Sequence, residues 1–155
     1  MTAIATKPLT QEHGADLDTR MAQSRDNWER DTALLADEVQ AWAEQEAAQK
    51  GWRVERAQKE LSEEVVGGTY HVPVITIYAA QGRLILEPIA RGVLGAQGRV
   101  DLSAWPSLYR VMLLHKPLGK EHGLAWVVRT ESGIDWPQPW GRETFLTLAE
   151  GLLNA

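Results

Sequence analysis

The segment from Thr69 to Thr130 constrains the fold most, because short apolar runs alternate in it with breaks that contain glycine or proline. Runs rich in Val, Ile, Leu and Tyr favour strands, and short breaks suit the turns between antiparallel neighbours. These runs are Thr69–Ala80, Arg83–Leu94, Arg99–Ala104, Tyr109–Leu114 and Leu124–Thr130. The sequence therefore predicts a meandering antiparallel sheet, and an alternating segment at Trp52–Arg56 adds a first strand.

A long helix is predicted before the sheet, over residues 27–50. Trp28, Leu35, Val39 and Trp42 recur at helical spacing and so share one face. Gly51 follows as a stop signal, with Lys50 as a cation in the last turn.

A short helix is predicted at the C-terminus, where the apolar residues Phe145, Leu148, Ala149 and Leu152 recur at helical spacing. The fold class is therefore α+β: a long N-terminal helix, about six mostly antiparallel strands and a short C-terminal helix. We expect both helices to pack on one apolar face of the sheet.

Composition sets the domain organisation. A chain of 155 residues fits one domain with a real core. Residues 1–26 carry few large apolar groups and are expected to form a flexible arm, followed by a single domain over residues 27–155. The glycines Gly92, Gly95 and Gly98 favour a hairpin turn, because no helix follows them as a phosphate-binding loop requires.

Charge and residue usage lower the expectation for several function classes. A net charge of −5 argues against nucleic-acid binding through bulk electrostatics. The absence of cysteine excludes disulfides and thiol chemistry. With no secretory signal and no apolar run of membrane-spanning length, we expect a soluble cytoplasmic protein.

Two carboxylates and a lysine are candidate catalytic residues. Glu87 and Asp101, with Glu55, would gather if their strands are neighbours, and carboxylates on a sheet can hold Mg²⁺ for phosphodiester cleavage. Lys116 would complete such a nuclease, although Leu114 stands where the metal pattern needs an acid. In the simpler interpretation, Glu87 and Asp101 pair with arginines such as Arg91 and Arg99.

The histidines offer a weaker metal hypothesis. His115 and His122 flank a loop and could converge with Glu121. No HExxH or HxxxH spacing supports the site, and histidines near a hairpin turn are more often solvated. We expect no bound cofactor or metal.

Three loop tryptophans are the strongest binding candidates. Trp105, Trp136 and Trp140 lie beside prolines, whereas Trp28, Trp42, Trp52 and Trp126 sit at positions expected in the core. Indoles in rigid loops either close the end of a core or form an exposed aromatic anchor for a partner.

The hypothesis that follows is a non-enzymatic protein–protein interaction module, such as an adaptor, a chaperone, an immunity-type inhibitor or an assembly subunit. It expects a protein partner or a homodimer, and neither a membrane nor nucleic acid. The alternative is a metal-dependent hydrolase of nucleic acid that uses Glu87 and Asp101. A small-molecule cavity lined by Trp52, Tyr70 and Trp126 is a third hypothesis.

Overall fold

The computed structural model describes residues 9–117 and 124–155, with side chains from residue 16 onward. Helix α1 spans Leu9–Lys50 and precedes six strands: β1 (Arg53–Glu63), β2 (Gly68–Ala79), β3 (Gly82–Ala90), β4 (Arg99–Trp105), β5 (Arg110–Pro117) and β6 (Leu124–Thr130). A short 3-10 turn, η1 (Glu64–Val66), joins β1 to β2, and helix α2 spans Arg142–Leu153. The expected α+β fold class is confirmed.

The sheet is an antiparallel meander whose spatial order follows the chain from β1 to β6. Strands β1 and β6 are therefore its edges. Pairing between β2 and β3 runs from Ala79↔Gly82 to Ile75↔Leu86 and stops there, just before Pro73, which has no amide hydrogen to donate. Pro73 was expected to mark a bulge or an unpaired end; it lies within β2, in register with Gln58 of β1, and is unpaired only on the β3 side.

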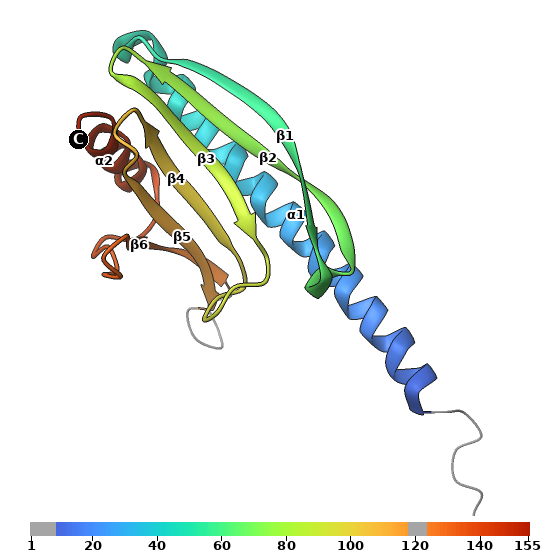
Figure 1. Ribbon diagram of the computed structural model, residues 1–155. Coiled ribbons are helices and arrows are strands. Elements are labelled where there is room, and N and C mark those ends of the chain that lie inside the picture. Colours follow the sequence, from blue (N-terminus) through green and yellow to red (C-terminus); the bar gives the residue numbers. More distant parts are fainter. Residues whose placement is uncertain (1–8, 118–123) are drawn as a thin grey trace, which may run out of the picture.

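Both helices pack on the sheet, and their buried residues form one hydrophobic core with those of β2 to β6. Figure 1 shows α1 running along β1 and β2, while α2 lies beside β3 and β4. Three residues of the predicted stripe of α1 are buried, since Trp28, Leu35 and Val39 are each at most 1% exposed, and the fourth, Trp42, is half-buried against the core. Thr32 is buried on the same face, and its hydroxyl is satisfied there because it donates a hydrogen bond to the Trp28 carbonyl 2.9 Å away.

The boundaries of α1 differ from the prediction at one end only. It ends as predicted at Gly51, which adopts a left-handed φ of 68° and lets the Trp52 amide donate to the Ala47 carbonyl at 3.0 Å. Its start lies at Leu9 rather than near Asn27, so residues 9–26 of the expected arm are helical. Arg25 reaches the carbonyl of Val66, which ties this segment to the β1–β2 turn.

Helix α1 is fixed to the sheet by a contact between Trp28 and Gly98. The Trp28 ring lies against Gly98 so closely that a Cβ at position 98 would come within 2.2 Å of it. Gly98 also has a φ of 147°, which side chains rarely adopt. Only glycine therefore lets the helix approach the start of β4 at this point.

We predict that Gly98→Ala lowers the free energy of unfolding by about 3 kcal/mol or more, since it adds overpacking to backbone strain. Gly95→Ala is the matched control: Gly95 also has a positive φ, of 78°, but open space where its Cβ would stand. The control should lose only about 1 kcal/mol. Urea unfolding of the variants measures the difference, and equal losses would contradict a packing role for Gly98.

Candidate functional site

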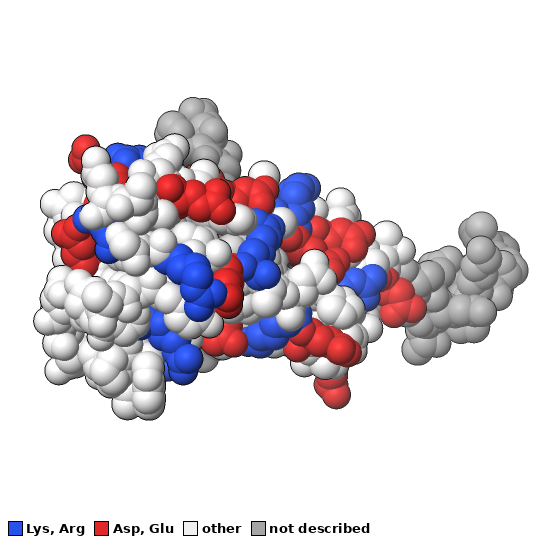
Figure 2. Space-filling view, turned by 90° about the horizontal axis from the view of Figure 1, so that it is seen from above, with Lys and Arg blue, Asp and Glu red and all other residues white. Residues whose placement is uncertain are grey.

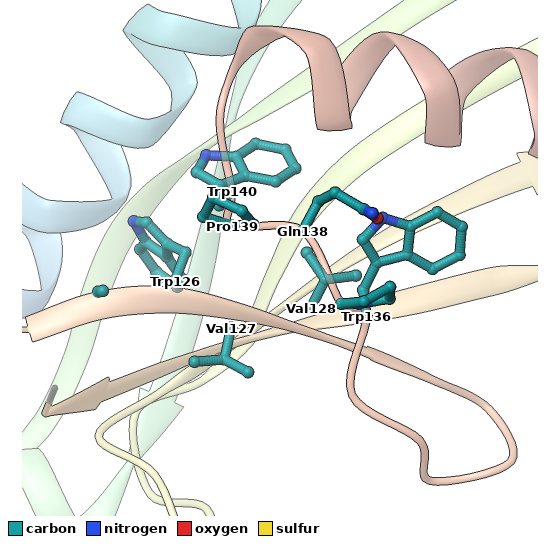
Figure 3. A pocket seen from close by; sticks show the side chains of 9 residues that line it. Trp126, Val127, Val128, Trp136, Gln138, Pro139 and Trp140 are labelled. Atoms are coloured by element: carbon teal, nitrogen blue, oxygen red, sulfur yellow. The ribbon is translucent and has the colours of Figure 1, made fainter.

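The most distinctive surface feature is an aromatic groove, which we define by Trp126, Trp136 and Trp140. It is an open hollow of about 550 Å³ beside the edge strand β6. Its other lining residues are Ala125, Val127, Val128, Pro137, Gln138 and Pro139. Figure 3 shows Trp126 and Trp140 on one side, Trp136 with Gln138 on the other, and Val128 between them, while Val127 points away.

One wall of the groove rests on α1. The Trp126 ring centroid lies 5.9 Å from that of Trp28, and the Trp140 centroid lies 5.8 Å from that of Trp42. Trp140 also meets Phe145 of α2 edge-on at 6.1 Å. Each wall indole is thus backed by an aromatic ring of a helix, so the wall cannot collapse inward.

The opposite wall is the segment from Asp135 to Pro139, which is pinned at both ends. Asp135 accepts a hydrogen bond from Arg129 at 2.8 Å, and the Trp136 amide donates to the Val128 carbonyl at 2.8 Å. The Pro139 carbonyl accepts from the Thr144 hydroxyl at 2.6 Å. Because two prolines also restrict its backbone, this wall is already in position before anything binds.

The electrostatics of this edge are set by the Arg129–Asp135 pair. The hydrogen bond from Arg129 is the main reason that the pKa of the Asp135 carboxyl is lowered, and the charges of Arg129 and Lys116 add to the effect. Lys116, on the neighbouring strand β5, therefore adds positive charge to the same edge of the sheet. Within the groove, Gln138 supplies the only amide side chain among its lining residues.

The expected binding tryptophans fall into two places. Trp136 and Trp140 are half-buried and line the groove together. Trp105 stands apart as the last residue of β4, 50% exposed, with the Arg83 guanidinium 5.7 Å from its ring centroid. Its neighbour Leu108, 66% exposed, adopts a left-handed φ of 65°.

Trp126 was expected to be a core residue, and sequence reasoning missed its place in the groove. Its alternation with Val128 does point it to the core side of β6. Because β6 is an edge strand, the ring is covered by the helix on one side only. The sequence did contain a signal: Trp126 is an inward-facing residue on the last strand of a predicted meander. Such a strand is an edge of the sheet, so its inward-facing rings can be left partly uncovered.

The candidate catalytic residues are only partly brought together. Glu87 and Asp101 are direct partners in the β3–β4 register, but Asp101 is paired with Met112, about 13 Å along β5 from Lys116. Glu55 belongs to the edge strand β1 and pairs with Arg53. Over residues 9–117 and 124–155, no three metal-ligating side chains gather.

The carboxylates of Glu87 and Asp101 are both paired with basic side chains. The Arg99 guanidinium donates to the two Asp101 oxygens at 2.7 and 2.9 Å, and Arg110 lies 3.6 Å away. Glu87 accepts from Lys59 at 2.8 Å rather than pairing with Arg91. The simpler interpretation of Asp101 is thus confirmed, whereas the partner expected for Glu87 was wrong.

His115 behaves differently from the expected solvated loop residue, because β5 extends through it to Pro117. It is 6% exposed and stacks on Trp126 with 4.2 Å between ring centroids. Burial lowers the pKa of its imidazole, Asp31 opposes this shift, and Arg91 adds to it. His122 and Glu121, its expected metal partners, lie outside the described residues. Trp52 and Tyr70, which were expected to line a small-molecule cavity with Trp126, are buried in the core, and neither belongs to the lining of the hollow at Trp126.

We predict that His115 makes folding weaken in acid. Its pKa is lower in the folded than in the unfolded chain, so unfolding takes up a proton as pH falls below about 6.5, the unfolded value. The stability advantage of the wild type over His115→Phe, which keeps the stacked ring, should shrink between pH 7.5 and pH 5.5. Urea titrations at both pH values measure this, with His71→Phe on the exposed surface as control. An advantage that stays constant or grows in acid would contradict the prediction.

Comparison with known proteins adds no assignment to this geometry. In the described part of the chain, no helix combines the length and apolarity needed to cross a membrane. No protein-family model matches the chain, and no curated protein or solved structure matches it either.

Proposed function

We propose that this chain is a protein-interaction module that holds an apolar side chain of a partner in the aromatic groove. The observation that carries the proposal is the combination of three tryptophans with a wall that is pinned before binding. Aromatic anchors in preformed hollows dominate the energy of protein interfaces, because they bury large areas at little cost in entropy.

The shape of the surface favours a polypeptide over a small molecule. A second hollow of about 600 Å³ lies on the other side of the same segment and shares Trp136, Gln138, Pro139 and Trp140 with the groove. Together they form a long, open surface, and apart from the shared Gln138 its polar side chains lie in the second hollow: Arg142, Glu143, Thr144 and Thr147. A small-molecule site is usually more enclosed and carries several convergent polar groups.

Charge on the visible surface also suits a protein partner better than nucleic acid. Figure 2 shows acidic and basic side chains interleaved along the body of the molecule, with mostly uncharged surface at the broad end. A nucleic-acid interface would be expected to gather lysine and arginine on one face. The metal-dependent hydrolase stays a prediction, and the geometry of Glu87 and Asp101 does not favour it.

We predict that Trp136→Ala weakens binding of the partner about tenfold or more, because it removes the outer wall of the groove. The half-buried ring packs only at the margin of the core, so the variant should still fold. The partner would be captured from the native host with tagged wild-type protein, identified by mass spectrometry, purified and titrated calorimetrically.

Trp105→Ala is the matched control, since it removes an exposed indole that lies outside the groove. It should bind like the wild type. Equal loss of affinity in both variants would move the interface to another surface. A saturable partner whose affinity is unchanged by Trp136→Ala, in a variant that is folded by circular dichroism, would contradict the proposal.

A further inference from the structure

Half of the β6 edge is already covered by the chain itself. The Trp136 amide donates to the Val128 carbonyl, and the Thr130 amide donates to the Ile134 carbonyl at 2.9 Å. Arg129 and Asp135 form an antiparallel bridge between these two bonds. A short extended segment thus adds to the edge of the sheet over Val128–Thr130 and ends at the outer wall of the groove.

The other half of the edge is open at Trp126. Because the outward-facing bonds of β6 belong to Val128 and Thr130, alternation turns the amide and carbonyl of Trp126 outward as well. The partner of Trp126 on β5 agrees with this, since the His115 amide and carbonyl bond to Gly98 and Gln97 on the opposite side. Among the described residues, no backbone hydrogen bond from outside the strand ladder reaches the main chain of Trp126.

We propose that β6 binds a short extended segment of the partner, which continues the sheet beside Trp126 and places an apolar side chain in the aromatic groove. This inference rests on the proposed function and specifies how the partner binds. The main-chain groups of Trp126 would supply hydrogen bonds, and the groove would select the side chain, as in other cases of strand addition. The bound strand would continue the line of the chain's own Asp135–Trp136 segment.

A second copy of this chain fits the open edge less well than a separate segment. Its β6 would carry the same covering segment over Val128–Thr130, so two copies could meet only through residues 124–127. Antiparallel pairing around Trp126 would then bring the Trp136 wall of each copy against Leu124 of the other. A free extended segment meets no such obstacle.

Charge suggests the composition of that segment. Lys116 pairs with Ala125 in the β5–β6 register, on the face of the sheet opposite the Trp126 ring, and only the small Ala125 separates it from the edge. No ion pair engages Lys116 within the described residues, whereas Arg129, four residues along β6 from Ala125, is paired with Asp135. An acidic residue that alternates with apolar ones would therefore place its carboxylate near Lys116 and the apolar side chains in the groove.

The probe is the peptide acetyl-Ser-Trp-Glu-Val-Ser-amide, used with the full-length protein labelled with 15N and 5-fluorotryptophan. We expect saturable shifts of the Trp136 fluorine signal and at least about tenfold slower hydrogen exchange at the Trp126 amide. Trp136→Ala, which lacks the fluorine reporter, should abolish the protection of the Trp126 amide, and Trp105→Ala should leave both effects unchanged. A peptide with Lys in place of Glu should bind more weakly, and this difference should shrink in high salt.

Main-chain recognition is tested by methylating one peptide nitrogen at a time. In an added strand only alternate amides face β6, so methylation should weaken binding about tenfold at every second position and little at those between. An even response to methylation would overturn strand addition.

The remaining outcomes separate this inference from the proposed function. Shifts at Trp136 without protection of Trp126 would overturn strand addition and leave the groove as a binding site. No binding of the peptide at about 1 mM would overturn the inference, while capture of a Trp136-dependent partner could still support the function. Protection of Trp126 without peptide, together with a dimer in sedimentation, would show that a second copy is the occupant.

Discussion

The contact between Trp28 and Gly98 is the constraint on which the rest of the arrangement depends. A side chain at position 98 would collide with the indole, so the glycine decides how closely α1 can approach β4. The same contact places the Trp28 ring near His115 and Trp126, with centroids 6.4 and 5.9 Å away. One close approach thus joins the helix, the start of β4 and the edge strand into a single packed unit.

Helix α1 also sets the dimensions of the groove. Trp28 and Trp42 lie on one face of the helix, about 21 Å apart at 1.5 Å per residue. The first backs Trp126 on β6, and the second backs Trp140 before α2. Since a helix is stiff over this length, the groove wall follows from the spacing of two residues far from it in sequence.

Sequence periodicity predicts much of this fold because the relevant patterns are local. The apolar stripe of α1, its glycine stop and the alternating strands all follow from short-range chemistry. The start of α1 was missed because residues 9–26 lack that stripe, and there the helix is tied down by a side-chain contact with a distant turn. The groove was predicted only in part. Prolines marked the loop at Trp136 and Trp140, but the position of the Trp140 ring depends on its contacts with Trp42 and Phe145, which no local pattern reveals.

The two sides of the sheet differ in what they leave for a partner. On the face away from the helices, Asp101 holds two arginines and Glu87 holds Lys59, so a partner would have to break ion pairs to use these charges. At the β6 edge, an apolar hollow and the main-chain groups of Trp126 face outward with no such competition among the described residues. Binding there would displace water alone, and that difference favours the edge strand over the charged face of the sheet as the proposed interaction surface.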